Sequence, residues 1–343
     1  MSVEIGVETF GDITSGTDGG LLSHAQVVRN VLAEGQTADR VGLDFFGVGE
    51  HHRVDYAISS PEVVLAALAS TTERIKLGSA VTVLSSDDPV RVFERFSTVQ
   101  ALSGGRAEII AGRGSFIESF PLFGFDLQDY ELLFAEHLDL LVELLSGDPV
   151  TWSGQTRAGL EDQQVFPTAE TPITTWVGVG GTPQSVVRAA QYGLPVMLAI
   201  IGGEPARFRP LVDLYHRALQ QFERPGLPVA AHLHGLVAET DEQAADLLFP
   251  HYRDQMLKMG AERGWGAYSR AAFDAALQPE GNLLVGGPET VARKMARVVR
   301  ELGLSRIDVK YSNGTLPHEA ALRSIELLGE QVKPRVLELL AED

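Results

Sequence analysis

Strand-like and helix-like segments alternate along most of the chain, and this alternation constrains the fold more than any other feature of the sequence. Strands buried in a parallel sheet form short apolar runs, and each run here is followed by a segment with helical spacing. Eight such runs can be identified: Val3–Glu8, Leu43–His52, Ile75–Leu84, Arg106–Ala111, Ile173–Val179, Pro195–Ile201, Val229–Ala238 and Arg306–Tyr311. Sustained βα alternation indicates a parallel sheet, and eight units close into a barrel. We therefore predict an α/β fold, a TIM (β/α)8 barrel.

The chain has 343 residues, more than the ~250 of a typical barrel of this kind. The excess predicts insertions after some strands, mainly the fourth and the seventh. Residues 148–171 form an irregular stretch that we expect to contain a small hairpin, and residues 241–276 suggest helix in pieces, broken at Gly260 and around Gly264–Gly266. Because no Pro/Gly linker or run of charge divides the chain, we expect residues 1–343 to form a single domain.

Charge and composition exclude several classes of function. The formal net charge is −18, which argues against nucleic acid and anionic membrane surfaces as partners. No apolar run is long enough to span a bilayer. The absence of cysteine excludes disulfides, thiolate metal sites and a cysteine nucleophile. The N-terminus lacks the basic region of a signal peptide, so we expect a cytoplasmic protein.

Three polar residues, Glu50, His51 and His52, end the second predicted strand. The carboxyl ends of barrel strands carry the active site, and imidazole transfers protons near neutral pH. If the strand runs through His52, side-chain alternation turns His51 away from its two neighbours, so at most one histidine need face the barrel axis. We favour a functional role for His51, whereas for His52 a structural role at the barrel rim and a functional role both stay open.

Two segments at neighbouring strand ends are suited to an anion. Arg113 lies between two glycines after the fourth strand, and the turn after the fifth strand contains Gly180, Gly181, Thr182 and Ser185 at the start of a helix. Glycines allow close backbone approach, and a helix N-terminus offers free N–H groups and positive potential. We predict that one phosphate bridges Arg113 and this turn, although a surface arginine and an ordinary helix start would give the same pattern.

His232 and His234 lie two residues apart in the seventh predicted strand, which places both imidazoles on one face. Such a pair is typical of a metal site, so a metal-dependent hydrolase is a rival hypothesis. We favour histidines in the pocket wall, and we predict no metal site.

Four stretches of the sequence resemble the flavin-dependent family that contains bacterial luciferase. They are GEHH at residues 49–52, the segment Leu77–Gly114, AAQYGLPVML at residues 189–198 and LPHEAALRSIELLGEQVKP near the end. The resemblance spans nearly the whole chain and keeps the order of the motifs. It implies a TIM-type barrel, often dimeric, that uses reduced FMN with molecular oxygen, or a deazaflavin, on small organic substrates.

The resemblance also implies roles for single residues. His51 matches the family's catalytic histidine, and Ala80 and Val81 match a pair that lies against the flavin ring and is often joined by a cis peptide. Arg113 matches a phosphate-binding arginine, and Gly180, Gly181, Thr182 and Ser185 match the phosphate turn. Gly112 replaces a cysteine of the luciferases and Gly181 replaces an acid, and these departures argue against luminescence and long-chain aldehyde oxidation.

From the residues and the resemblance together we predict a monooxygenase that takes reduced FMN, O2 and a small organic substrate. A homodimer is expected, and a separate flavin reductase is a candidate partner because the chain lacks a GxGxxG motif. Two alternatives stay open: a deazaflavin-dependent oxidoreductase that transfers hydride, and a protein that binds flavin without catalysis. Phe10, Val48, Thr82, Met197 and Ile200 are the expected pocket walls, with a lid beyond Gly260.

Overall fold

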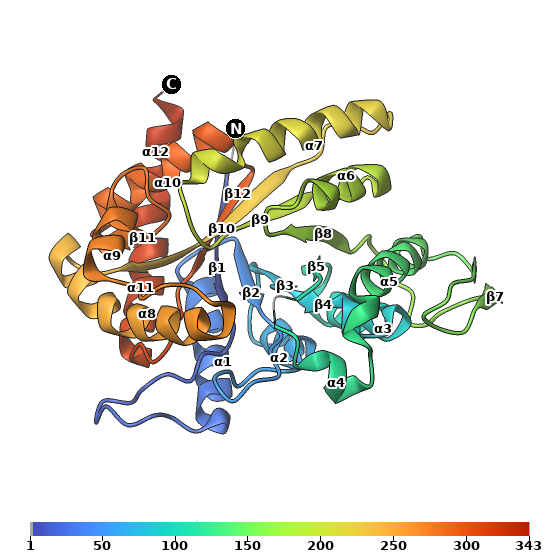
Figure 1. Ribbon diagram of the computed structural model, residues 1–343, viewed down its shortest axis with the longest axis horizontal. Coiled ribbons are helices and arrows are strands. Elements are labelled where there is room, and N and C mark those ends of the chain that lie inside the picture. The colour runs from blue at the N-terminus through green and yellow to red at the C-terminus, as the bar shows by residue number, and fades with distance from the viewer. Residues whose placement is uncertain (1–2, 115, 343) are drawn as a thin grey trace.

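The computed structural model describes residues 3–114 and 116–342, which form a closed barrel of parallel strands surrounded by helices (Figure 1). The chain enters the barrel in the order β1, β2, β3, β5, β8, β9, β10 and β12, and pairing of β12 with β1 closes it. The barrel strands are β1 (Glu4–Thr9), β2 (Phe45–Val48), β3 (Lys76–Ser79) continued by β4 (Thr82–Val83), β5 (Ala107–Gly112), β8 (Thr174–Val179), β9 (Val196–Ile200), β10 (Val229–Val237) and β12 (Arg306–Lys310). The predicted TIM barrel is confirmed.

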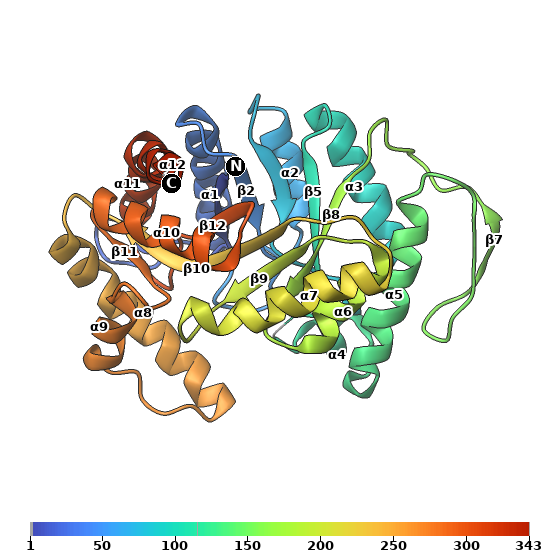
Figure 2. The ribbon, with the colours of Figure 1, turned by 90° about the horizontal axis from the view of Figure 1, so that it is seen from above.

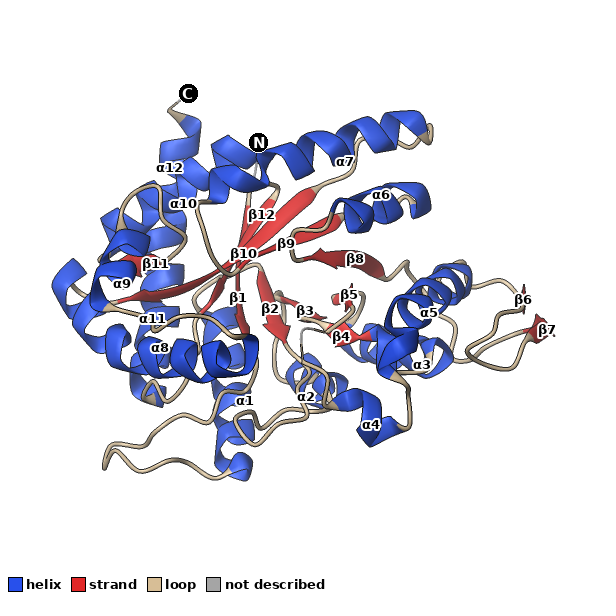
Figure 3. Ribbon diagram, viewed as in Figure 1, coloured by secondary structure: helices blue, strands red, loops and turns tan. Residues whose placement is uncertain are grey.

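Helices lie around the outside of the barrel (Figure 3). They are α1 (His24–Arg40), α2 (Pro61–Ala69), α3 (Pro89–Ser103), α5 (Tyr130–Leu144), α6 (Pro183–Tyr192), α7 (Arg209–Gln221), α10 (Pro288–Leu302), α11 (His318–Leu327) and α12 (Lys333–Ala341). Helix α3 shows how sequence sets their ends. The Asp88 carboxylate accepts hydrogen bonds from the backbone N–H groups of the first turn, and Gly104 ends the helix in the left-handed conformation (φ +64°).

Two predicted strands are shorter than expected. The second ends at Val48, because residues 49–52 leave the sheet as soon as the apolar run stops. The third was expected to be continuous over Ile75–Leu84, but it is interrupted at the Ala80–Val81 peptide bond, which is cis. The chain rejoins the sheet in β4, where Thr82 and Val83 pair with the end of β5.

The insertions lie after the strands where we expected them. Residues 148–171 contain the antiparallel hairpin of β6 (Val150–Trp152) and β7 (Leu160–Gln163), which extends from the barrel beside α5 (Figure 2). A short helix, α4 (Ser119–Phe123), follows β5. The segment after β10 forms α8 (Asp241–Arg263), α9 (Arg270–Leu277) and a short strand, β11 (Leu284–Gly286), that pairs with the end of β10. The sequence did not indicate β11.

The predicted helix break at Gly260 is wrong, because α8 continues to Arg263 and ends at Gly264 (φ +70°). Gly260 lies in the last turn, where its carbonyl accepts the N–H groups of the Gly264 cap and of Trp265. A glycine inside a helix costs only about 1 kcal/mol relative to alanine, so it does not by itself end one.

The amino-terminal part of the barrel interior is tightly packed. The Arg306 guanidinium lies 4.0 Å from the ring centroid of Phe45 and 4.5 Å from that of Trp176, and it binds the Glu108 carboxylate at 2.6 Å. Nearby, burial raises the pKa of the Asp308 carboxyl well above its usual range. This packing closes one end of the barrel and leaves space at the carboxyl ends of the strands. Among the described residues, no helix combines the length and apolar content needed to cross a bilayer.

Candidate active site

A cavity of about 340 Å³ opens at the carboxyl ends of the barrel strands. Its walls come from the ends of most barrel strands, from the loops after β2 and β5, and from the last turns of α8. Six of the predicted site residues line it: His51, Ala80, Val81, Arg113, Gly180 and Thr182. The other two, Gly181 and Ser185, lie beside Thr182 without lining the cavity. The candidate residues therefore gather at one place, as the strand order predicted.

His51 is held by aromatic rings. Its imidazole stacks on Phe10 at a centroid distance of 4.8 Å, and it contacts Tyr56 at 4.3 Å and the edge of Phe116 at 5.3 Å. Burial lowers the pKa of His51 to about 3, so the imidazole is neutral at pH 7. Its Nδ1 atom is buried and has no hydrogen-bond partner among the described residues. The cavity thus contains a neutral imidazole with a free polar atom.

Glu50 and His52 also line the cavity, and the condition under which His51 would face away from them, a strand running through His52, is not met. Alternation applies within a strand, and these residues lie beyond its end at Val48. The Glu50 carboxylate accepts the backbone N–H of Val83 at 2.9 Å and bonds His52 Nε2 at 2.8 Å. Glu50 thereby fixes the start of β4, and His52 has a structural partner.

The Ala80–Val81 segment forms part of the cavity wall between β3 and β4. Glycines lie where it packs against the neighbouring strands: a Cβ atom at Gly112 would come within 2.6 Å of Val81 Cγ2, and one at Gly47 within 2.9 Å of Ala80 Cβ. The cysteine that luciferases carry at the position of Gly112 would displace Val81 here. The small residues allow the Ala80–Val81 backbone to sit close to the sheet.

Arg113 and the turn after β8 form an anion corner, defined by Arg113, Thr182 and Ser185. Arg113 Nη2 donates to Thr182 Oγ1 at 3.2 Å, and the Thr182 and Ser185 hydroxyl oxygens lie 2.7 Å apart. Gly181 has φ +126°, a conformation that a side chain would strain. Thr182 is the N-cap residue of α6, but its hydroxyl does not cap a backbone N–H of that helix. Pro183 has no N–H and the Ser185 N–H donates to the Thr182 carbonyl, so the first turn of α6 offers the Gln184 N–H beside a guanidinium and two hydroxyls.

A carboxylate competes for Arg113. Glu131, at the start of α5, forms an ion pair with Arg113 and lies 3.7 Å from Arg188. Its side chain is 62 % exposed, so it can turn away into solvent when an anion binds. The donor set is otherwise that of a phosphate site: a guanidinium, hydroxyls and a helix N-terminus.

The two histidines of β10 both line the cavity, and each is held through Nδ1. His232 bonds the Glu8 carboxylate at 2.8 Å, and His234 bonds Asn313 Oδ1 at 2.6 Å. Burial lowers the pKa of His234 to about 3. In the described residues no group of three or more His, Cys, Asp and Glu side chains could hold a metal ion. These contacts favour the wall role over the hydrolase hypothesis.

The mouth of the cavity is crossed by residues that the sequence did not indicate. Arg53 forms ion pairs with Glu118 after β5 and with Glu262 of α8, the latter through contacts of 2.5 and 3.1 Å. Gln255, Met259 and Arg263 of α8 line the cavity. The C-terminal part of α8 is therefore part of the cavity wall, whereas a lid was expected beyond Gly260.

Four of the five expected wall residues do not line the cavity, and only Phe10 does. In β9, Ala199 and the following Ile201 face the cavity and Ile200 faces the helices, since side chains alternate. Met197 lies lower, in a cluster with Phe45 and Trp176. Which side chains line the cavity depends on how far along the strand they lie as well as on which face of the sheet they occupy. The alternation of side chains gives the face but not the position along the strand.

A sequence profile of the family described as luciferase-like monooxygenase matches residues 6–306. This chain belongs to the luciferase-like monooxygenase family. The match covers every barrel strand from β2 to β10 and confirms the resemblance seen in the sequence motifs.

Proteins with known names or solved structures resemble the chain over most of its length. Limonene 1,2-monooxygenase from Rhodococcus erythropolis is 27% identical over 308 residues, which is 86% of this chain and 78% of that enzyme. The oxygenating constituent of 3,6-diketocamphane monooxygenase from Pseudomonas putida, a type II Baeyer–Villiger monooxygenase in complex with FMN, superposes with a TM-score of 0.77 at 18% identity over 98% of this chain and 99% of that one. An F420-dependent secondary alcohol dehydrogenase superposes with a TM-score of 0.73 at 15% identity, over 98% of this chain and 99% of that one. At these identities the two structures establish the shared barrel fold.

Proposed function

We propose that this member of the family is a monooxygenase that uses reduced FMN and O2 to oxidise a small organic molecule. The observation that carries the proposal is the position of the anion corner at the rim of the cavity that His51 faces. A phosphorylated redox ring needs a phosphate site at the edge of a closed pocket and a proton-handling group inside it. Limonene 1,2-monooxygenase and the FMN-bound monooxygenase structure support the same assignment.

The donors available fit the cofactor. Arg113, the Thr182 hydroxyl and the first turn of α6 would hold the FMN phosphate, and the Ala80–Val81 segment would support the ring. Bound reduced FMN supplies the electrons with which O2 is split, one oxygen atom entering the substrate and the other leaving as water. The chain itself has to bind, orient and shield the reactants.

His51 has the properties of a proton-handling residue. Its lowered pKa makes it neutral and only weakly basic at pH 7, so Nδ1 can accept a hydrogen bond from a group that exchanges a proton or, as the other tautomer, donate one to it. Phe10, Tyr56 and Phe116 pack around its ring and keep water from that side of the cavity. A dry, apolar surrounding limits side reactions of a reactive oxygen species with water.

A second candidate is an oxidoreductase that transfers hydride with a deazaflavin, since the F420-dependent alcohol dehydrogenase has the same fold. The two activities differ in their need for oxygen. The test is an anaerobic titration with reduced FMN and with reduced F420, followed by mixing with 18O2 and a panel of cyclic compounds of six to ten carbon atoms.

The proposal predicts saturable binding of reduced FMN and a product that carries one 18O atom by mass spectrometry. The Arg113→Ala variant should require more FMN to reach the same rate. Turnover with F420 under strict exclusion of oxygen, without FMN binding, would establish the second candidate. FMN binding without oxygen consumption for any compound would favour the non-catalytic alternative.

A further inference from the structure

The cavity contains a second imidazole with a free polar atom, on a different strand from His51. His232 Nε2 is buried and has no hydrogen-bond partner among the described residues, and His232 lines the cavity. The roles proposed above for His51 and Arg113 leave this atom without a function. A buried hydrogen-bond donor or acceptor without a partner destabilises the fold by about 1–3 kcal/mol. Such an atom on a residue that lines a ligand cavity therefore points to a ligand group that forms the missing hydrogen bond.

Glu8 determines which hydrogen-bonding group His232 presents. The Glu8 Oε2 to His232 Nδ1 distance is 2.8 Å, and the side chains are 1 % and 9 % exposed. A carboxylate accepts hydrogen bonds, so Nδ1 is the nitrogen that donates to Glu8, and in the neutral tautomer of such a pair the lone pair lies on Nε2. The Glu8–His232 pair therefore offers an acceptor to a ligand.

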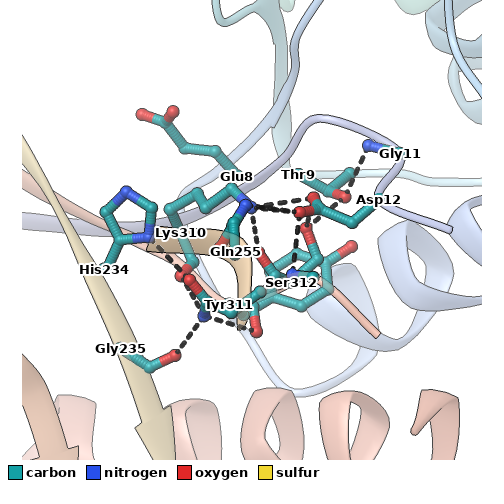
Figure 4. A network of polar contacts seen from close by, with 12 residues as sticks. Glu8, Thr9, Gly11, Asp12, His234, Gly235, Gln255, Lys310, Tyr311 and Ser312 are labelled. Carbon is teal, nitrogen blue, oxygen red and sulfur yellow. Dashed lines mark hydrogen bonds and ion pairs between the residues drawn. The ribbon is translucent and has the colours of Figure 1, made fainter. Parts of the chain in front are cut away.

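The nearby lysine is occupied elsewhere, so it does not compete for Glu8. Figure 4 shows the Lys310 ammonium bound to the Asp12 carboxylate, with oxygens at 2.7 and 2.9 Å, and to the carbonyl of Ser312. The Ser312 hydroxyl and the Gly314 N–H donate to the same carboxylate. Glu8 Oε2 bonds His232 Nδ1, and Glu8 Oε1 is buried without a hydrogen-bond partner among the described residues.

The strand order places His232 across the cavity from the segment expected to support the flavin. In the closed ring of strands, β10 is four positions from the strand formed by β3 and β4, so it stands on the opposite side. Between these walls the lining is mainly apolar, with Phe10, Ala199, Ile201 and Met259. A substrate lying over the cofactor would have its outer side toward His232.

We propose that His232 Nε2 accepts a hydrogen bond from a hydroxyl group of the substrate, and that Glu8 is a positioning residue that holds the ring in the tautomer with its proton on Nδ1. The substrate class is a small, mainly apolar molecule with one alcohol or phenol hydroxyl. This inference deepens the proposed monooxygenase function and rests on it for the identity of the ligand as substrate. A site built to bind a hydroxyl rejects the analogue that lacks it, because the protein acceptor is then left unpaired.

The first test is the tautomer of His232, which needs neither flavin nor oxygen. In 15N-labelled protein at pH 7.5, correlation spectra through the ring protons distinguish a protonated from an unprotonated ring nitrogen. The proposal predicts a protonated Nδ1 and an unprotonated Nε2 in the wild type. In Glu8→Gln the amide can donate to Nδ1, so part of the population should move its proton to Nε2. A wild-type ring with its proton on Nε2, or on both nitrogens, would overturn the proposal.

The second test is binding of matched probes to the flavin-free protein. Cyclic alcohols of six to ten carbon atoms are compared with their methyl ethers by isothermal titration calorimetry. One hydrogen bond in a buried site predicts that the preferred alcohol binds roughly tenfold more tightly than its ether. His232→Phe should bring this ratio to about one, and His232→Gln, which keeps an acceptor, should restore part of it.

His216→Gln, which removes an exposed imidazole from α7, should leave the ratio unchanged. Equal binding of alcohol and ether by the wild type, or binding of no alcohol of the series, would overturn the proposal. So would an unchanged ratio in both His232 variants. Because these measurements involve no FMN, a failure of FMN binding in the earlier titration would be recorded separately from a failure here.

Discussion

Arg113 and Thr182 meet at the rim of the cavity, where the guanidinium Nη2 lies 3.2 Å from the threonine hydroxyl. The two residues are 69 positions apart in the chain and come from the ends of neighbouring strands, β5 and β8. Their contact places a fixed positive charge beside the N-terminus of α6. Neither element alone is specific for a phosphate, but together they form a site with charge, hydroxyls and helix dipole directed at one point.

Replacement of Arg113 by alanine should weaken FMN binding and leave riboflavin binding unchanged. A charge-assisted hydrogen bond contributes about 1.5–3 kcal/mol, which corresponds to roughly a 10- to 100-fold increase in the Kd of FMN. Riboflavin lacks the phosphate, so its Kd should change little. Fluorescence titration measures both constants. The control is Arg91→Ala, which removes an arginine side chain that is 73 % exposed on α3. Equal weakening of FMN and riboflavin would show that Arg113 acts on the fold and not on the phosphate.

Replacement of Glu131 by glutamine should tighten FMN binding. The Glu131 carboxylate forms an ion pair with Arg113, and a phosphate has to displace it. Removing the competing charge should lower the Kd of FMN roughly three- to tenfold at low salt, with a smaller gain at high salt because exposed charges are screened. Titrations at two salt concentrations test both parts. A Kd that rises in the variant would mean that Glu131 orients Arg113 for binding.

Sequence patterns were sufficient to predict the barrel fold and to predict that the candidate site residues lie together. Both predictions follow from local signals. Strand and helix periodicity gave the order of elements, and the carboxyl ends of parallel strands meet at one end of the barrel. Arg113 and the turn at Thr182 could therefore be expected to lie together before any coordinates. The family resemblance added the cis Ala80–Val81 bond, which residue patterns alone do not show.

The parts that sequence did not predict depend on long-range packing. Glu8 lies in β1 and His232 in β10, separated by 224 positions, and nothing local marks them as partners. Glycine disfavours helix, yet α8 continues past Gly260 to Arg263, and the Gly260 carbonyl accepts the N–H groups of Gly264 and Trp265 beyond the helix end. The alternation argument for His51 failed since it assumed a strand through His52, whereas the strand ends at Val48.

Replacement of Gly112 by alanine should destabilise the protein. The added Cβ would lie 2.6 Å from Val81 Cγ2 and 2.9 Å from Val81 Cβ, and a β-branched side chain next to the sheet has little freedom to move. Overpacking of this kind costs about 1–3 kcal/mol. Chemical denaturation measures the change in the free energy of unfolding. Gly226→Ala is the control, because a Cβ there meets no described atom within 4 Å. Equal stability of the two variants would contradict the packing described for Val81.

His51 should make the stability of the protein depend on pH below about 6.5. Its folded-state pKa is about 3, lower than the ordinary value of 6.5, so in that interval the unfolded chain binds a proton that the folded protein does not. The stabilisation is therefore complete above pH 6.5 and is lost as the pH falls toward 3.

The slope due to one such group is at most about 1.4 kcal/mol per pH unit. Between pH 6 and pH 4, the free energy of unfolding of the wild type should fall relative to that of His51→Gln, with a slope of up to this value. His216→Gln should show no such shift. An equal pH dependence in wild type and His51→Gln would indicate that the imidazole is reached by solvent and titrates normally.

The most direct measurement of the central claim is a crystal structure of the protein with FMN bound. The account predicts the phosphate within hydrogen-bond distance of the Arg113 guanidinium and the Thr182 hydroxyl, with the Glu131 carboxylate displaced and the ring against Ala80–Val81. A phosphate bound away from Arg113, with the Arg113–Glu131 ion pair intact, would contradict it.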